Sequence, residues 1–191
     1  MRICVFCGSR AGSSPAHARA ARQVGRIVAE RGHTLVYGGA GSGLMGEVAW
    51  AASRAGARIE GVMPRFLFGR EAPGEAPPQD FTVTDTMHDR KHEMFERSDA
   101  FVALPGGYGT LDEVIEVMSL TYLGRMNKPL VLLDVDGAWR QFVRLVRDMR
   151  DRGFADGQAR DLFSIADDAP AAVETAEREW ARRSRPHGGT A

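Results

Sequence analysis

The sequence predicts an α/β fold in a single domain. Short apolar runs alternate with segments of helical periodicity along a chain of 191 residues, of which 43% are hydrophobic. Two glycine-rich turns follow such runs, at the carboxyl ends of strands, where parallel sheets bind their ligands. We therefore expect a Rossmann-like parallel sheet with helices on both faces over residues 1–181. The remaining residues, 182–191, are Arg-rich and then Gly-Gly-Thr-Ala, so we expect a disordered tail with nothing to bury.

The charge balance excludes several classes of partner. Lys and Arg number 25, and Asp and Glu also number 25, so no overall field attracts nucleic acid or an acidic membrane. Any anion site must therefore be local. No apolar run is long enough to span a bilayer, and the first residues enter a strand without the layout of a signal peptide. We expect a soluble cytoplasmic protein.

Cys4 and Cys7 form a C-x-x-C pair in the first apolar run or at its end. Redox pairs of this type sit at the start of a helix, so the position of these two cysteines argues against a redox or metal role. We expect no metal site.

The first half of the chain gives two strand–helix units and a third strand. The predicted strands cover residues 2–8, 33–37 and 57–63, and the predicted helices cover residues 15–31 and 44–55. Pro15 favours the first turn of a helix, Ser13 or Ser14 would cap it, and Gly32 ends it.

The turn at residues 38–46 contains Gly41-x-Gly43-x-x-Gly46, the spacing of a dinucleotide-binding fingerprint. That fingerprint also needs an acid near the end of the following strand, whereas Glu60 lies inside the predicted strand, and we expect no second catalytic domain. Three interpretations remain: a dinucleotide site, a tight turn with a purely structural role, and a contact with the phosphate or ribose of a mononucleotide.

Residues 64–80 contain four prolines and little periodicity, which predicts an unusually long loop of the kind that often covers an active site. Phe66, Leu67 and Phe68 would anchor it. Arg70 and Glu71 are its polar candidates, although a solvated ion pair between them is an equally good interpretation.

A strand at residues 81–86 precedes a helix at residues 87–97. Arg90 and Lys91 stand in its first turns, where positive charge opposes the helix dipole, so their position suggests a further duty or a solvated helix face. His88 and His92 share a face, but the H-E-x-x-H zinc signature is absent.

The rest of the chain is organised around residues 105–113, which follow a predicted buried strand at 98–104. Glycines and a helix start place free backbone N–H groups and the positive end of a dipole together, which favours an anion such as a phosphate. Thr110 and Glu113 have the spacing of a capping box that would open this helix. Glu113 therefore either closes the cap or faces the anion site.

The helix that begins there is predicted to run to Leu123, with apolar residues on more than one face. That breadth indicates a buried partner helix from a second subunit, or a thick core within one chain. A strand at residues 129–134, a helix at 139–152, a short strand at 163–165 and a helix at 170–180 complete the prediction.

Together these features favour chemistry at a sugar carbon. The sequence has an anion cradle, a cationic pair and one carboxylate, but no catalytic triad spacing and no Walker-type lysine after either glycine turn. Glycoside hydrolysis passes through an oxocarbenium-like transition state, which needs negative charge and a positioned water.

Three motifs, in this order, resemble those of the LONELY GUY cytokinin-activating phosphoribohydrolases over residues 2 to about 154. They are Gly38-Gly39-Ala40-x-x-Gly43-Leu44-Met45-Gly46, Met87-His88-x-Arg90-Lys91 and Pro105-Gly106-Gly107-Tyr108-Gly109-Thr110-x-x-Glu113. The resemblance implies hydrolysis of the N-glycosidic bond of cytokinin riboside 5′-monophosphates, and of AMP, to free base and ribose 5-phosphate.

The resemblance also implies the site. Arg90 and Glu113 would be the catalytic pair. The substrate would contact Glu71, Arg90, Lys91 and Ser119, which stands where the family has threonine. It would also contact residues after the first strand, in the 38–46 turn and in the 105–113 motif, namely Ser9, Gly39, Gly43, Met45, Gly106, Gly107, Tyr108, Gly109, Thr110, Leu111, Asp112 and Glu113. The spacing of residues 72–80 departs from the family's pattern, so the match at Glu71 is the weakest.

The resemblance further implies a homodimer and a small-molecule substrate, a nucleoside 5′-monophosphate. It implies no cofactor, and nothing in the chain gives reason to invoke pyridoxal phosphate. The alternative hypothesis is a protein that binds a nucleotide or the molybdenum cofactor without turning it over, as the related molybdenum-cofactor carriers do.

Overall fold

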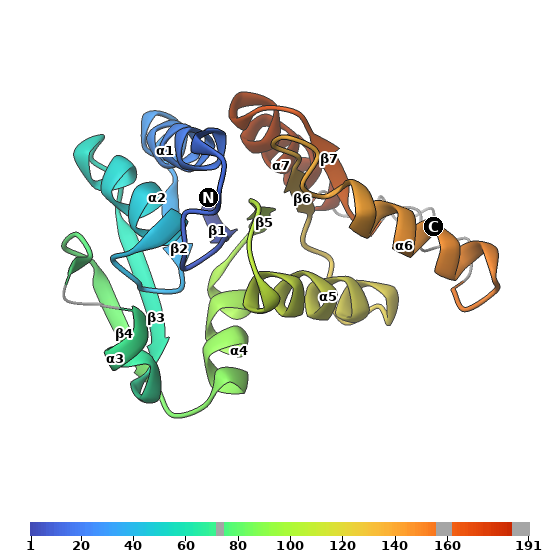
Figure 1. Cartoon of the computed structure of the whole chain (residues 1–191), viewed down its shortest axis with the longest axis horizontal. Coiled ribbons are helices and arrows are strands. Elements are labelled where there is room, and N and C mark those ends of the chain that lie inside the picture. Colours follow the sequence, from blue (N-terminus) through green and yellow to red (C-terminus); the bar gives the residue numbers. More distant parts are fainter. Residues whose placement is uncertain (72–74, 156–161, 185–191) are drawn as a thin grey trace, which may run out of the picture.

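The computed structural model describes residues 1–71, 75–155 and 162–184, and it contains a seven-stranded, fully parallel sheet with helices on both faces (Figure 1). The predicted fold class is therefore confirmed. No helix in this described part of the chain is long and apolar enough to cross a membrane.

The elements alternate as predicted and differ from the prediction mainly at their ends. The strands are β1 Arg2–Phe6, β2 Thr34–Tyr37, β3 Ile59–Pro64, β4 Asp80–Thr84, β5 Ala100–Ala103, β6 Leu130–Leu133 and β7 Ser164–Ala166. The helices are α1 Pro15–Glu30, α2 Gly43–Arg54, the 3₁₀ turn η1 Arg65–Leu67, α3 Phe68–Glu71, α4 Met87–Arg97, α5 Tyr108–Tyr122, α6 Arg140–Asp151 and α7 Ala169–Arg183.

The strand order β4-β3-β2-β1-β5-β6-β7 places the start of the chain at the centre of the sheet. From β1 the chain moves outward to β4, returns to place β5 beside β1, and then moves outward the other way. The order therefore reverses between β1 and β5, and open α/β sheets bind ligands at such a point, outside the carboxyl ends of the strands. The turns that follow β1, β2 and β5 all lie at this edge.

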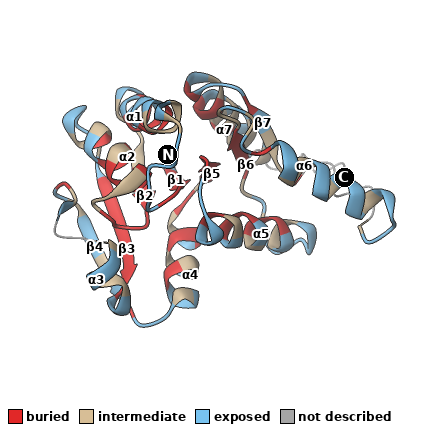
Figure 2. Ribbon diagram, viewed as in Figure 1, coloured by how far each residue is buried: buried red, intermediate tan, exposed pale blue. Residues whose placement is uncertain are grey.

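The sheet separates two apolar cores. One face is covered by α1, α2 and α7, and the other by α4, α5 and α6 (Figures 1 and 2). Successive strand residues alternate between the cores: Val5 packs in the first and Phe6 in the second, where Phe6 stacks on Phe101 with ring centroids 5.4 Å apart. Burial on both faces explains why β1 reads as a continuous apolar run.

The segment expected to be one long loop, residues 64–80, begins with η1 and α3. Leu67 and Phe68 pack against the first core as expected, whereas Phe66 is 59% exposed and anchors nothing. The Trp50 indole donates a hydrogen bond to the Glu75 carbonyl at 3.0 Å, which ties the later part of the segment to α2.

The capping box predicted for Thr110 and Glu113 is wrong. Helix α5 begins at Tyr108 and has Gly107 as its N-cap, with no side-chain hydrogen bond at the cap. Counting Tyr108 as the first residue, Glu113 is the sixth and lies one turn beyond the positions a capping side chain occupies. The glycine turn can open a helix without a capping side chain because its free N–H groups face a cavity, as described below.

Helix α7 continues to Arg183, past the predicted end at Trp180 and into the stretch expected to be tail. Arg182 and Arg183 stand in its last turn, where positive charge suits the helix dipole. The rest of the predicted tail, residues 185–191, lies outside the described residues.

Helix α5 buries one face and leaves apolar side chains on another. Ile115 is 51% exposed and Leu123 is 68% exposed, and on α6 Leu145 is 55% exposed. The interpretation of α5 as a helix in a thick core is therefore wrong, and an uncovered apolar surface remains on α5 and α6.

A glycine in α1 allows the first two helices to pack closely. A Cβ at Gly25 would collide with the carbonyl oxygen of Val48 on α2 and would lie 3.0 Å from the Ala52 nitrogen. We predict that Gly25→Ala destabilises the protein by about 1–2 kcal/mol, because the overpacking cost exceeds the gain of roughly 1 kcal/mol from the better helix propensity of alanine.

Thermal unfolding measures this effect. The matched control is Gly69→Ala on α3, where a Cβ would meet nothing within 4 Å. A melting temperature for Gly25→Ala at or above that of the wild type would contradict the close packing of α1 on α2.

Candidate active site

The site is built where the turns after β1, β2 and β5 meet. The Gly8 N–H donates to the Pro105 carbonyl at 3.3 Å, and the Leu44 N–H donates to the Gly8 carbonyl at 3.0 Å. These backbone hydrogen bonds connect the three turns into one surface.

The glycines of the 38–46 turn serve this packing. Gly43 has φ +61° and lies against the backbone of Ser9, while a Cβ at Gly46 would collide with the Gly41 carbonyl. Glu60 is buried in ion pairs with Arg2 at 3.4 Å and Arg58 at 3.6 Å, so it is not placed to hold a ribose. Of the three interpretations of the fingerprint, the tight structural turn has direct support and the dinucleotide site has none.

A cavity of about 250 Å³ opens beside these turns. Residues of α3, α4 and α5 close it, and its charged groups are Glu71, Arg90 and Glu113. Its complete lining is Val5, Cys7, Gly8, Ser9, Gly38, Met45, Glu71, Arg90, Gly107, Tyr108, Gly109, Thr110 and Glu113.

Arg90 is 5% exposed and its guanidinium is held from several sides. Its Nε donates to the Val62 carbonyl at 3.1 Å, its Nη2 donates to the Gly38 carbonyl at 3.0 Å, and the same nitrogen lies 3.6 Å from Glu71 Oε2. Gly38 has to be glycine because a Cβ there would collide with the guanidinium. The rigid fork of arginine is therefore fixed before any ligand arrives.

Glu113 is 7% exposed and faces the same cavity. Burial is the main cause that raises the pKa of its carboxyl from 4.5 to about 7; Arg90 opposes the rise, Asp112 and Glu71 add to it, and Lys91 opposes it. A carboxyl with this pKa exchanges protons near neutral pH, which a helix cap does not require and a general acid–base group does.

The start of α5 presents backbone N–H groups to the cavity, an arrangement that favours an anion. Gly107 to Thr110 line the cavity, and the first backbone N–H groups of a helix have no partner within the helix. A Cβ at Gly107 or at Gly109 would meet nothing within 4 Å, so both glycines border open space. Gly106 has another role, because a Cβ there would collide with Thr110 Oγ1.

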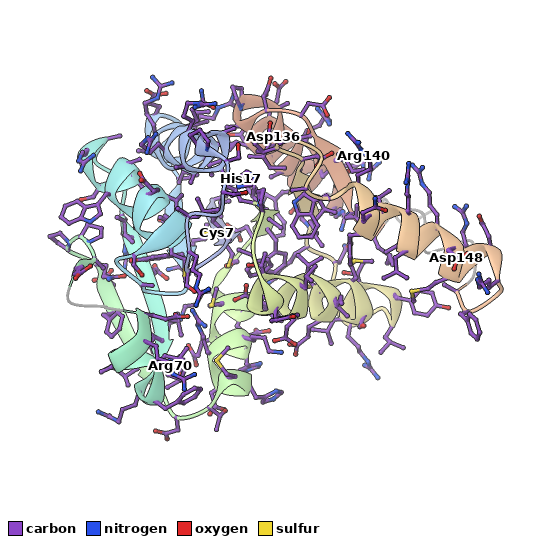
Figure 3. The ribbon with its side chains drawn as sticks, viewed as in Figure 1. Cys7, His17, Arg70, Asp136, Arg140 and Asp148 are labelled. Atoms are coloured by element: carbon purple, nitrogen blue, oxygen red, sulfur yellow. The ribbon has the colours of Figure 1, made fainter. Side chains whose placement is uncertain are left out.

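Several predicted site residues lie outside this cavity. Lys91 is turned toward α5, where it pairs with Asp112 and Glu116. Ser119 is exposed, and the other predicted contacts outside the cavity lining are Gly39, Gly43, Gly106, Leu111 and Asp112. Glu71 does line the cavity, whereas its neighbour Arg70 is exposed (Figure 3). The interpretation of Arg70 and Glu71 as an ion pair is therefore wrong, since Glu71 pairs with Arg90.

The sequence analysis missed Val5, Cys7, Gly8 and Gly38 as lining residues. Each stands at the carboxyl end of β1 or β2, which is the signal that could have identified them. Burial raises the pKa of the Cys7 thiol far above its ordinary value, so the thiol stays protonated. In the parts of the chain that the structure describes, no group of three His, Cys, Asp or Glu side chains is placed to hold a metal ion.

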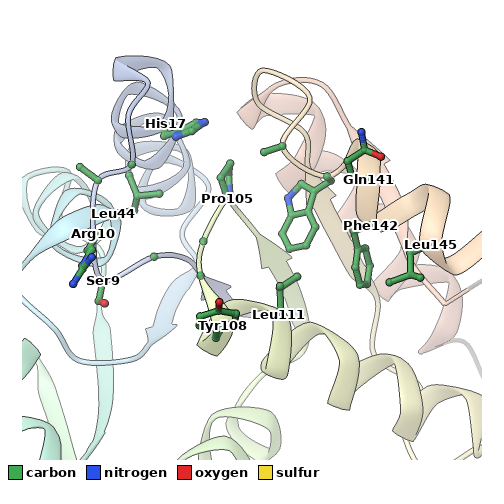
Figure 4. Close-up of a pocket in the computed structure, with 17 residues that line it drawn as sticks. Ser9, Arg10, His17, Leu44, Pro105, Tyr108, Leu111, Gln141, Phe142 and Leu145 are labelled. Carbon is green, nitrogen blue, oxygen red and sulfur yellow. The ribbon is translucent and has the colours of Figure 1, made fainter.

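A second, larger hollow of about 950 Å³ surrounds the 105–108 turn, with lining residues on both sides of it (Figure 4). Leu44, Leu111, Trp139, Phe142 and Leu145 give it an apolar wall, with Arg10, His17 and Gln141 among its polar members. The two hollows share Gly8, Ser9, Gly107 and Tyr108, so a ligand with one charged and one apolar end could occupy both.

Comparisons with known proteins agree with these features. A family model described as "Possible lysine decarboxylase" matches residues 45–176. The cytokinin riboside 5′-monophosphate phosphoribohydrolase LOG7 of Arabidopsis thaliana is 44% identical over 176 residues, which are 92% of this chain and 81% of that protein. A protein of Oryza sativa subsp. japonica, named "Probable cytokinin riboside 5'-monophosphate phosphoribohydrolase LOGL9", is 46% identical over 92% of this chain and 77% of its own length.

Among solved structures, the Moco carrier protein from Chlamydomonas reinhardtii has a TM-score of 0.69 at 26% identity, over 95% of this chain and 98% of the carrier. The family model covers more than half of the chain, and both phosphoribohydrolases match most of it at higher identity than the carrier does. The chain therefore belongs to the LOG family, the cytokinin riboside 5′-monophosphate phosphoribohydrolases.

Proposed function

We propose that this protein hydrolyses the N-glycosidic bond of cytokinin riboside 5′-monophosphates, and of AMP, to give the free base and ribose 5-phosphate, and that it does so as a homodimer. The observation that carries the proposal is the buried Glu113 carboxyl facing the same cavity as Arg90 and the start of α5. The names of the relatives support the same reaction.

Each group has a distinct part in this mechanism. The helix start binds the 5′-phosphate, which places the ribose in the small cavity. The Glu113 carboxylate stabilises the positive charge that develops on the sugar and accepts a proton from the attacking water. As the bond from C1′ to the base nitrogen breaks and the bond from C1′ to the water oxygen forms, that proton becomes available to the departing base.

Arg90 has no proton to give because its guanidinium does not ionise near neutral pH. Its fixed charge next to Glu113 anchors the substrate or the departing base. The same charge also opposes the rise in the pKa of Glu113, which keeps a useful fraction of the carboxylate present near neutral pH.

A carrier that binds without turnover is the second hypothesis, and the likeness to the Chlamydomonas carrier supports it only at 26% identity. A carrier has no evident use for a buried carboxyl whose pKa is raised to about 7. Release of base from AMP and from isopentenyladenosine monophosphate by the purified protein distinguishes the two hypotheses, because a carrier releases none.

We expect the catalytic efficiency to depend strongly on the 5′-phosphate of the substrate. Each charge-assisted hydrogen bond at the helix start contributes roughly 1.5–3 kcal/mol, so loss of the phosphate should lower kcat/KM by orders of magnitude. We predict that AMP is cleaved at least about a hundredfold more efficiently than adenosine, as measured by base release. Comparable efficiencies would contradict a phosphate site at Gly107 to Thr110.

The carboxylate is tested with Glu113→Gln, which keeps the shape and removes the charge. We predict a fall in turnover of about two orders of magnitude or more, with nucleotide binding retained. In the wild type the carboxylate is the active form, so turnover should rise with pH through about 7. Near-wild-type turnover in a well-folded variant would remove Glu113 from the mechanism.

Stability provides an internal control for this variant. The folded-state pKa of Glu113 is raised, so its favourable contribution is fully present below pH 4.5 and is lost as the pH rises through about 7. Glu113→Gln should therefore melt at or above the wild-type temperature at pH 8, and the difference should shrink toward pH 4.5.

The uncovered apolar residues of α5 and α6 support the homodimer. Ile115 and Tyr122 are exposed on α5, Leu123 is exposed directly after it, and Leu145 and Met149 are exposed on α6. Exposed apolar surface of this kind marks protein interfaces, and a twofold dimer would bury it against its own copy.

We predict a dimer mass by light scattering at low micromolar concentration, and a shift to monomer in Ile115→Asp because a carboxylate would be buried without a partner. Phe66→Asp on η1 is the matched control, since Phe66 is 59% exposed and Ile115 is 51% exposed. A monomeric wild type would contradict the proposed assembly.

A further inference from the structure

Lys91, which the sequence predicts as a substrate contact, forms its ion pairs outside the cavity. Its Nζ lies 2.8 Å from Asp112 Oδ2 and 2.5 Å from Glu116 Oε2, and its side chain is only 13% exposed. Over the described residues, these are the only ion pairs or side-chain hydrogen bonds that connect α4 with α5.

The positions of these residues connect the pair to the catalytic groups. Lys91 follows Arg90 on α4, and Asp112 precedes Glu113 on α5. Consecutive side chains on a helix point about 100° apart, so one of each pair can face the cavity while its neighbour faces the other helix. Asp112 and Glu116 are four residues apart and share the face that receives Lys91.

The carboxylates around Lys91 make its surroundings unfavourable for a phosphate. One ammonium between two carboxylates gives a cluster with net negative charge, which repels an anion. Lys91 is also absent from the lining of both hollows, whereas the backbone of the α5 start is present in the small one.

We infer that Lys91 is a positioning residue, which fixes α4 against α5 through Asp112 and Glu116 and so holds Arg90 in register with Glu113, and that it does not bind the substrate's phosphate. The kinetic part of this inference rests on the proposed hydrolysis. Misplacement by about 1 Å far from the reacting atoms is enough to lower turnover about a hundredfold.

The same pair acts electrostatically on Glu113. The negative charge of Asp112 raises the pKa of Glu113 and the positive charge of Lys91 lowers it. The other groups that interact with Glu113 are Arg90 on α4, Glu71 on α3 and the thiols Cys4 and Cys7 on β1. Removal of either charged partner should therefore move the pH dependence of turnover, which a merely structural contact would not do.

The experiment measures kcat, KM for AMP and the pH–rate profile of three variants, Lys91→Met, Glu116→Gln and Asp112→Asn. We expect Lys91→Met to lower kcat about tenfold or more while KM for AMP stays within about threefold, and Glu116→Gln to change kcat in the same direction. The midpoint of the profile should move to higher pH in Lys91→Met and to lower pH in Asp112→Asn. The exchanged pair Lys91→Glu/Glu116→Lys should recover turnover relative to Lys91→Glu.

Glu93→Gln is the matched control, because Glu93 is also on α4 but pairs with Arg97 on its own helix. It should leave kcat and KM unchanged. A rise of about tenfold or more in KM for AMP in Lys91→Met, with Glu116→Gln unaffected, would make Lys91 a phosphate ligand and overturn the inference. Wild-type kinetics in all three variants would overturn it as well.

A thermal double-mutant cycle keeps the inference independent of the proposed reaction. If the wild type released no base from any nucleoside monophosphate, the hydrolase would fail, but Lys91→Met, Glu116→Gln and the double variant could still be compared by melting temperature. Non-additive changes in melting temperature support an interaction between Lys91 and Glu116 that connects the two helices. Strictly additive changes contradict it.

Discussion

The site depends on one arrangement, in which the buried Glu113 carboxyl shares a cavity with the Arg90 guanidinium, and backbone carbonyls hold that guanidinium in place. Hydrogen bonds to the carbonyls of Val62 and Gly38 hold the Arg90 guanidinium, and its positive charge lowers the pKa of Glu113. Burial then outweighs the attraction of the nearby charge, and the pKa of Glu113 rises to about 7. The buried carboxylate therefore lowers the stability of the folded protein at neutral pH, and raised pKa values of this kind cluster at functional sites.

The rest of the fold serves that arrangement. The reversal of strand order between β1 and β5 brings three glycine turns to one edge of the sheet. Glycines at 38, 43 and 46 let backbone and side chains approach more closely than a Cβ would permit. Helices α4 and α5 cover the same face of the sheet. Each presents one charged side chain, Arg90 or Glu113, to the cavity and the neighbouring side chain to the other helix.

Much of this could be predicted from the sequence, because local patterns determine it. The period of the apolar residues predicted every strand and every long helix, and the glycine turn after an apolar run predicted a helix start at the edge of the sheet, where the structure has a cavity. The capping box failed because Thr-x-x-Glu is a local pattern, whereas the helix start is set by Gly107 and the cavity in front of it. The partners of Lys91 could not be predicted, since they depend on how two helices pack across the sheet. The need for glycine at position 38 could not be predicted for the same reason, because it depends on the position of the Arg90 side chain.

The central claim is that the Glu113 carboxyl titrates near neutral pH and that its ionisation governs base release. Infrared difference spectroscopy of the carboxyl band over a pH series, with Glu113→Gln as the subtraction reference, measures that ionisation directly. The account predicts a midpoint near pH 7 that coincides with the midpoint of turnover on AMP. A carboxyl that titrates near its ordinary value of 4.5, or a turnover profile that is flat through the carboxyl's midpoint, would contradict it.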